Sequence, residues 1–288
     1  MAETVGFIGL GRMGHGMAAN LSRSFSVMGF DVDAGRFAGL EKVTRVDSVA
    51  AIARGCTCVC LSLPGANVVE DVCLGREGLA GRMPRGALVI DMSTSLPSVS
   101  RRVAARLAGD GVAFADAPVS GGEAGARDAA LAIMVGAPRD TYDRCLPILS
   151  AMGRSVVHVG EVGAGGVAKL VNNMIVGAAF AVIAEGFALA ERSGIEAGVL
   201  YDAIKDGWAG SKVLDVSAAA VAARSYPPGG TVDMLVKDLD YARTLAAEAH
   251  VPIPMSALAH EVFVAGQAAG HGKESQPSVI ELWRAASG

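Results

Sequence analysis

Lys169 and Asn173 are the two side chains whose types and spacing are best suited to proton transfer beside a bound ligand. They lie four residues apart in a segment that predicts a helix, so both project from one helical face. A lysine near the start of an apolar helix is partly desolvated, and desolvation favours the neutral amine that can accept a proton. On spacing alone, a surface lysine with an incidental amide neighbour is the simpler interpretation.

A glycine-rich turn near the start of the chain has the pattern of a phosphate cradle. It follows a strand-like segment and opens a helical pattern, as a dinucleotide-binding turn requires. Gly9 permits the tight turn, Gly11 lets the backbone approach a pyrophosphate, and Gly14 allows close packing of helix and strand. The alternative is an ordinary glycine turn. We predict that a dinucleotide binds at Gly9-Leu10-Gly11-Arg12-Met13-Gly14.

Asp31 ends the second predicted strand, 20 residues after Gly11. A carboxylate at this position accepts hydrogen bonds from the hydroxyls of an adenosine ribose and repels a 2′-phosphate. Asp33 adds to that repulsion, and Arg36 is the only nearby group that could counter it. A solvated strand end is the alternative. The pattern favours NAD over NADP.

The loop Ser120-Gly121-Gly122 follows another predicted strand. Bare backbone N–H groups and one hydroxyl in such a loop can bind a carboxylate. A glycine-rich loop without a ligand is the alternative.

These residues lie in a chain whose first part alternates strands and helices. Repeated βα units predict a mostly parallel, doubly wound sheet with helices on both faces. We predict a dinucleotide-binding Rossmann domain at 1–162 and an all-helical substrate and oligomerisation domain at 163–288. The predicted strands are 4–8, 25–30, 58–63, 87–91, 113–116, 131–135 and 155–159, and the later helices are 166–193, 196–205, 211–223, 233–249, 256–269 and 279–286.

The predicted helix over 166–193 is apolar nearly all round and roughly 40 Å long. A helix exposed to water would show one polar face, so we expect a second subunit to cover it, in a homodimer or homotetramer. Its most apolar run, 174–184, ends at Glu185 after 11 residues. A membrane span needs roughly 20, so no membrane association is predicted.

The composition excludes other classes of protein. Of 288 residues, 51% are hydrophobic and 19% charged, which is typical of a globular protein. The net charge is −4 without a basic run, so nucleic acid is not expected as a partner. Neither C-x2-C nor H-E-x-x-H spacing occurs, so no metal site is predicted and the five cysteines are interpreted as core residues. The start of the chain lacks a signal-peptide pattern, which predicts a cytoplasmic protein.

Four motifs, in the same order along the chain, resemble those of the β-hydroxyacid dehydrogenase family. This family includes 3-hydroxyisobutyrate dehydrogenase, tartronate semialdehyde reductase (2-hydroxy-3-oxopropionate reductase) and L-threonate dehydrogenase. The likeness covers essentially the whole chain. One departure is Ser22-Arg23-Ser24, where the family commonly has a glycine, and it bears on the placement of Asp31. The motifs are 7–21, Asp116-Ala117-Pro118-Val119-Ser120-Gly121-Gly122, 163–173 and Lys237-Asp238-Leu239.

The resemblance implies roles for residues on the substrate side. Lys169 would be the catalytic lysine and Asn173 its substrate-binding neighbour. The loop Ser120-Gly121-Gly122 would hold the substrate carboxylate. Lys237 looks like the residue that closes over cofactor and substrate, although a surface ion pair with Asp238 is the alternative.

On the cofactor side, Thr94 looks like the residue beside the nicotinamide, and Leu63-Pro64 resembles the loop that flanks the cofactor. The expected activity is hydride transfer between NAD and a short β-hydroxy acid, giving a semialdehyde or oxo acid, with Lys169 as general acid/base. Few basic residues besides Lys237 could grip a phosphate, so L-threonate, D-glycerate or 3-hydroxyisobutyrate is favoured over a sugar phosphate.

Two other functions fit parts of the sequence. Imine reductases share the layout, but they usually carry another residue at the position of Lys169. A catalytically silent NAD-binding protein is the second alternative, because fold alone does not establish function.

Overall fold

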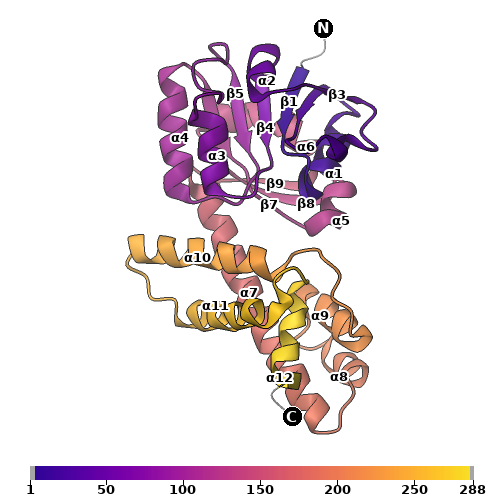
Figure 1. Ribbon diagram of the computed structural model, residues 1–288. Helices are drawn as coiled ribbons and strands as arrows, with labels where there is room; N and C mark the ends of the chain where they lie inside the picture. Colours follow the sequence, from indigo (N-terminus) through magenta and orange to yellow (C-terminus); the bar gives the residue numbers. More distant parts are fainter. Residues whose placement is uncertain (1–3, 286–288) are drawn as a thin grey trace. The chain divides into compact units, whose positions relative to one another are not determined.

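In the computed structural model, which describes residues 4–285, the strands all lie within the first 160 residues (Figure 1). They form one sheet in the order β3-β2-β1-β4-β5-β6-β8-β7, with β9 paired to β8. The pairs from β3 to β6 are parallel, whereas β8 runs antiparallel to β6 and β7. The strands are β1 (Thr4–Ile8), β2 (Ser26–Phe30), β3 (Val43–Arg45), β4 (Cys58–Leu61), β5 (Leu88–Asp91), β6 (Ala113–Asp116), β7 (Val119–Ser120), β8 (Leu131–Gly136) and β9 (Gly153–Gly160).

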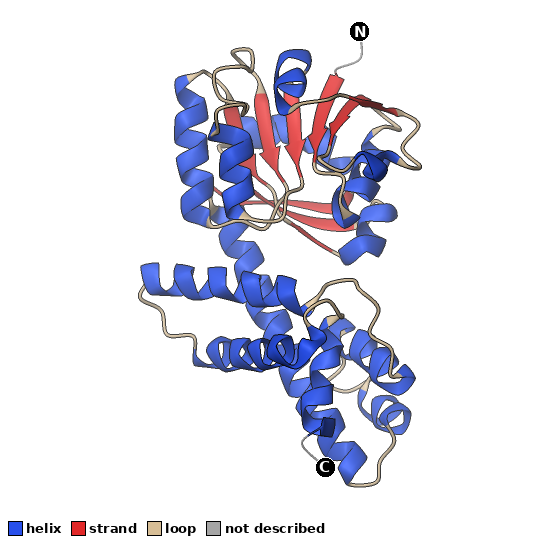
Figure 2. Ribbon diagram, in the orientation of Figure 1, coloured by secondary structure: helices blue, strands red, loops and turns tan. Residues whose placement is uncertain are grey.

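Helices lie in front of and behind this sheet (Figure 2). Every residue of β4 and β5 is buried, because a parallel sheet covered on both faces needs continuous apolar strands rather than alternating ones. The helices are α1 (Arg12–Leu21), η1 (Ala34–Phe37), α2 (Val49–Gly55), α3 (Ala66–Leu74), α4 (Pro97–Gly109), α5 (Gly122–Arg127) and α6 (Arg139–Ser150).

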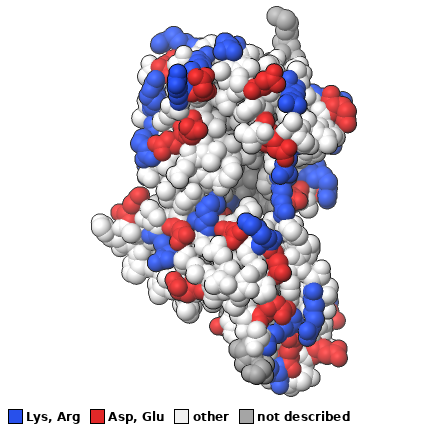
Figure 3. All heavy atoms as spheres, in the orientation of Figure 1, with Lys and Arg blue, Asp and Glu red and all other residues white. Residues whose placement is uncertain are grey.

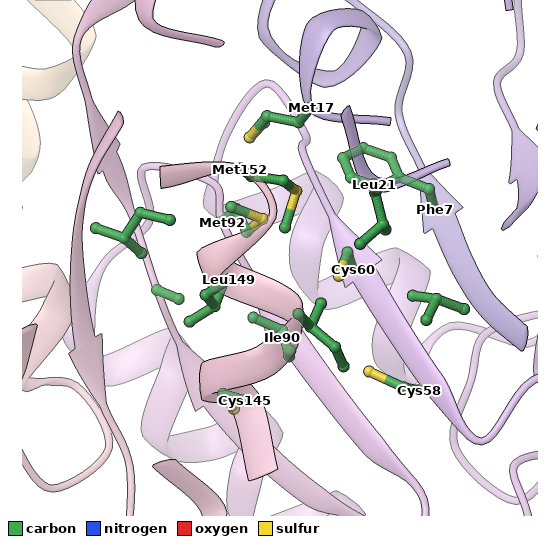
Figure 4. Packing of buried hydrophobic residues seen from close by; sticks show 14 of the residues in the cluster. Phe7, Met17, Leu21, Cys58, Cys60, Ile90, Met92, Cys145, Leu149 and Met152 are labelled. Atoms are coloured by element: carbon green, nitrogen blue, oxygen red, sulfur yellow. The ribbon is translucent and has the colours of Figure 1, made fainter. Parts of the chain in front are cut away.

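A buried cluster between the sheet and helices α1 and α6 forms the core of this part, and it includes Cys58, Cys60 and Cys145 (Figure 4). All five cysteines are free and buried. Burial raises the pKa of Cys56 to about 11 and that of Cys145 to about 12. The thiols of Cys56 and Cys145 therefore stay protonated, and all five cysteines pack as small apolar side chains.

The chain divides into two compact units, residues up to Lys169 and residues from Leu170. Helix α7 (Ala164–Arg192) begins in the first unit and continues into the second. The core of the second unit includes Phe187 and Phe263, both almost fully buried. Its other helices are α8 (Ala197–Ile204), α9 (Lys212–Ala223), α10 (Val232–Glu248), α11 (Pro254–Gly266), η2 (Gln267–His271), η3 (Gln276–Ile280) and α12 (Glu281–Ala285).

The predicted fold class is confirmed: a doubly wound sheet is followed by a long helix and an all-helical region. Strands β3 and β7 and helix α5 are not predicted from the sequence. These elements have three, two and six residues, which is too short for a periodic signal. The predicted helix over 279–286 is instead the end of η3 followed by α12, and residue 286 lies outside the described residues.

Helix α7 is long and apolar enough, by length and composition, to cross a membrane. Its most apolar 18-residue window has a mean hydropathy of 1.8, and 33% of that window is buried within the chain. The length of the run 174–184 is therefore a poor measure of this helix, because Glu185 interrupts the apolar run without ending the helix. A core helix of a globular protein has the same features.

Charged side chains of both signs are interspersed on the face of the molecule shown in Figure 3. This distribution agrees with the small net charge of −4.

Candidate active site

The glycine-rich turn connects β1 to α1 at the carboxyl end of the parallel strands. Gly9 has a φ of +92°, and a Cβ there would collide with the carbonyl oxygen of Ser62. A Cβ on Gly14 would collide with the carbonyl oxygen of Gly9. The space beside Gly11 is open: among the described residues, a Cβ placed there would meet nothing within 4 Å beyond its chain neighbours and its own helix backbone. Gly11 is also the N-cap of α1, and it has no side chain to accept a hydrogen bond from the amides of the first turn. The open space and the N–H groups of the first turn fit a pyrophosphate.

The side chains of the other residues of this turn lie in the core or at the surface. Leu10 is fully buried, and Met13 packs against the core. Arg12 is exposed, and its guanidinium lies 3.3 Å from the Glu123 carboxylate of α5. Leu10 and Met13 therefore shape the turn, while Arg12 borders it.

Asp31 ties the end of β2 to the glycine-rich turn. Its Oδ2 accepts a hydrogen bond from the Leu10 amide at 2.6 Å, and its Oδ1 accepts one from the Asp33 amide at 2.8 Å. The unusual turn Ser22-Arg23-Ser24 thus leaves Asp31 beside the cradle. The Arg36 guanidinium lies 3.3 Å from the Asp33 carboxylate, so the positive charge of Arg36 is paired with Asp33. Two carboxylates at the end of β2 fit a ribose with free hydroxyls better than a 2′-phosphate.

The ends of β4 and β5 are joined by hydrogen bonds that sequence reasoning missed. The Leu63 amide donates to Oγ of Ser93 at 2.9 Å, and the Ser93 amide donates to Oδ1 of Asp91 at 3.0 Å. An Asp side chain that accepts a hydrogen bond from the amide two residues later forms an Asx turn. The signal available in the sequence was an Asp at the end of a predicted strand. Leu63 and Thr94 are half-buried and Pro64 is exposed, so they border the sheet end where dinucleotides bind in open α/β folds.

The loop Ser120-Gly121-Gly122 connects β7 to α5. Gly121 and Gly122 have φ values of +137° and +63°, a region that other residues rarely adopt. Both glycines are exposed and Ser120 is half-buried. Backbone amides and a hydroxyl at the start of a short helix suit a carboxylate.

Lys169 lies in the second turn of α7 and is half-buried. Asp116, at the end of β6, holds the preceding turn: Oδ1 accepts from the Gly163 amide and Oδ2 from the Gly166 amide, both at 2.7 Å. Burial raises the pKa of Asp116 to about 7, although the two amide hydrogen bonds favour its charged form. Asp91, its partner in register on β5, is also buried, and burial raises its pKa to about 6.

In the second unit, Asn173 and Lys237 meet at one carboxylate. Nδ2 of the buried Asn173 donates to Oδ2 of Asp238 at 2.7 Å, and Nζ of Lys237 lies 2.7 Å from Oδ1 of Asp238. The same ammonium lies 4.9 Å from the ring centre of Tyr241. Sequence reasoning treated Asp238 only as an ion-pair partner of Lys237, because its contact with Asn173 spans 65 positions along the chain.

Two family models match consecutive parts of the chain. The NAD binding domain of 6-phosphogluconate dehydrogenase matches residues 4–160, and the NAD-binding domain of NADP-dependent 3-hydroxyisobutyrate dehydrogenase matches residues 163–283. The 2-(hydroxymethyl)glutarate dehydrogenase of Eubacterium barkeri is 33% identical over 99% of this chain and 96% of its own. The chain belongs to the β-hydroxyacid dehydrogenase family.

Other members of the family are similar over comparable lengths. The 3-hydroxyisobutyrate dehydrogenase of Pseudomonas aeruginosa is 37% identical over 90% of both chains. The crystal structure of 3-hydroxyisobutyrate dehydrogenase from Salmonella typhimurium superposes with a TM-score of 0.89, at 29% identity over 97% of this chain and 99% of that chain.

As a member of this family, the protein is an enzyme, an oxidoreductase of the NAD-dependent dehydrogenase class. The imine reductase of Streptomyces aurantiacus shares 24% identity and a TM-score of 0.66, so it shares the fold alone. In the described residues 4–285, no group of three or more His, Cys, Asp or Glu side chains could hold a metal ion.

Proposed function

We propose that this β-hydroxyacid dehydrogenase transfers a hydride between NAD and a short β-hydroxy acid, with a semialdehyde or oxo acid as the oxidised product. The half-buried Lys169 carries this proposal, because it lies on α7 one turn before Asn173. The buried Asp238 holds the Asn173 amide at 2.7 Å. An amine and an oriented amide one helical turn apart can both form hydrogen bonds with the reacting oxygen of a substrate.

The residues of the glycine-rich turn fit NAD, since the space beside Gly11 is open and Asp31 lies next to the turn. When bound, NAD supplies a nicotinamide that accepts or returns the hydride. Lys169, as general base, takes the proton from the substrate hydroxyl during oxidation and returns it during reduction. The Nδ2 group of Asn173 has two hydrogens, and the one not donated to Asp238 can donate to the substrate.

The substrate we propose carries a hydroxymethyl group on the carbon next to a carboxylate. The two relatives act, by their names, on 2-(hydroxymethyl)glutarate and 3-hydroxyisobutyrate, which share this unit. The loop Ser120-Gly121-Gly122 supplies the N–H groups and hydroxyl for that carboxylate. The charge of Lys237 is compensated by Asp238, which favours an unphosphorylated acid.

We assign residues 1–162 to the dinucleotide-binding domain and 163–288 to the substrate and oligomerisation domain. On the cofactor side we place Gly9, Leu10, Gly11, Arg12, Met13, Gly14, Asp31, Leu63, Pro64 and Thr94, with Lys237 closing over cofactor and substrate. An NAD-dependent metabolic enzyme of this kind is expected in the cytoplasm.

The proposal is tested by following NADH formation with a panel of acids: 3-hydroxyisobutyrate, 2-(hydroxymethyl)glutarate, L-serine, L-threonate and D-glycerate. We expect turnover with at least one acid that carries the hydroxymethyl unit. A protein that binds NAD but oxidises none of these acids would support the catalytically silent alternative.

Asp31 is expected to set the preference for NAD. Asp31→Ser removes the carboxylate that lies beside the glycine-rich turn and is expected to accept hydrogen bonds from the adenosine ribose. Loss of this charged acceptor should raise KM for NAD roughly tenfold or more. The ratio of kcat/KM between NAD and NADP measures the change. Asp143→Ser, which removes an exposed acid on α6 paired with Arg139, is the matched control and should leave the ratio unchanged. An unchanged ratio in Asp31→Ser would refute the assignment.

An apolar stripe on α7 supports a homo-oligomer. Val171, Ile175, Val182 and Leu189 are 45%, 67%, 61% and 69% exposed. Separations of four and seven residues place them on one helical face, where a second copy of this chain would bury them.

Val182→Glu would place a charge in this interface and is expected to yield monomers, because burying an unpaired charge is costly. Light scattering after size exclusion gives the mass, which also separates dimer from tetramer. Val216→Glu on α9, where the valine is 55% exposed, is the matched control. A wild-type monomer would exclude the oligomer.

A further inference from the structure

Asp116 makes contacts that the proposed chemistry does not require. Its side chain is buried, and it is the last residue of β6. The loop toward Ser120 leaves directly from it. Its two carboxylate oxygens each accept one amide hydrogen bond, from Gly163 and Gly166, so a single side chain holds the beginning of α7.

We propose that Asp116 is a positioning residue that fixes the first turn of α7 and thereby places Lys169 relative to the Ser120-Gly121-Gly122 loop. This inference rests on the proposed role of Lys169 as general acid/base. Lys169 follows Gly166 by three residues, less than one helical turn. A rotation or fraying of the first turn would therefore move the amine directly.

The surroundings of the carboxylate are shaped to hold it. A Cβ on Gly136 would lie 2.6 Å from Asp116 Oδ1, and a Cβ on Gly165 would lie 2.9 Å from Asp116 Oδ2. Gly163 has a φ of +96°, which turns the chain into the helix in a conformation that other residues rarely adopt. Gly136 and Gly165 thus leave room for the carboxylate, and Gly163 supplies the backbone conformation of the turn that binds it.

A carboxylate is the side chain that this geometry requires. Asn would keep one acceptor but turn an NH2 group toward a second amide donor, so one buried N–H group would lose its partner. The backbone on the strand side is also tied down, because the Ala117 amide donates to the carbonyl oxygen of Asp91 at 2.6 Å. Asp116 therefore joins the start of the substrate loop to the helix that carries Lys169.

The test compares Asp116→Asn with Asp110→Asn in the NAD-bound enzyme. Asp110 also accepts a backbone amide hydrogen bond, from Gly81 at 2.8 Å, but it follows the carboxyl end of α4. The opposite end of α4 is the one beside α7, where a Cβ on Gly166 would contact Pro97. We expect Asp116→Asn to speed hydrogen exchange of the Gly163 and Gly166 amides roughly tenfold or more. We expect kcat to fall about tenfold to a hundredfold, with unchanged affinity for NAD. Asp110→Asn should change neither.

The double variant Asp116→Asn/Lys169→Ala separates positioning from general destabilisation. If Asp116 acts through Lys169, adding Asp116→Asn to Lys169→Ala lowers kcat no further. An additional loss equal to that in the wild-type background would overturn the proposal. Unchanged exchange at Gly163 and Gly166 in Asp116→Asn would overturn it as well.

Two measurements keep the inference separate from its premises. If the wild-type enzyme oxidises no hydroxy acid, the proposed function fails, and the rate at which an amine-reactive reagent labels Lys169 replaces kcat. A changed rate in Asp116→Asn, but not in Asp110→Asn, supports positioning, and equal rates overturn it. If Asp116→Asn does not fold, wild-type exchange decides: Gly163 and Gly166 amides that exchange as fast as exposed loop amides overturn the proposal.

Discussion

Lys169→Ala is expected to lower kcat for hydroxy-acid oxidation by about 10²–10⁴-fold, the usual contribution of a general acid or base. The amine is the group assigned to move the hydroxyl proton, and alanine cannot replace it. Affinity for NAD should stay the same, because the cradle lies in the turn between β1 and α1 and is made of backbone. Steady-state kinetics and a titration of NAD binding measure the two quantities.

Lys205→Ala is the matched control for this change. Lys205 follows α8 and forms an exposed ion pair with Asp202, so its loss should leave kcat unchanged. Turnover of Lys169→Ala comparable to wild type would remove the proton-transfer assignment.

Gly14→Ala is expected to reduce NAD affinity by about 10²-fold and to destabilise the fold by about 1–3 kcal/mol. The added Cβ would collide with the carbonyl oxygen of Gly9, so α1 must move away from the turn. That movement displaces the N–H groups that are expected to bind the pyrophosphate. Calorimetric titration with NAD and thermal unfolding measure the two effects.

Gly11→Ala is the informative companion variant. Within residues 4–285, a Cβ on Gly11 meets nothing within 4 Å beyond its chain neighbours and its own helix backbone, so Tm should hardly change. The same Cβ would occupy the space expected for the pyrophosphate, so NAD affinity should still fall. If Gly11→Ala binds NAD as tightly as wild type does, the glycine-rich turn is not the phosphate cradle.

Local patterns in the sequence predict the fold class because each depends on neighbouring residues. Continuous apolar runs such as β4 indicate buried parallel strands, and strands alternating with helices indicate a doubly wound sheet. The short elements β3 and α5 leave no such signal. Their formation depends on pairing with β2 and on packing against α1, which are tertiary contacts.

The identity and order of the candidate site residues are properties of the sequence: glycines at fixed spacing, an acid after the second strand, and Lys169 four residues before Asn173. Their partners are decided by tertiary structure. Asp116 reaches amides 47 and 50 positions away, and Asn173 reaches Asp238 across 65 positions. Periodicity carries information over a few turns of helix, whereas these contacts exist because folding brings distant strand ends and helices together.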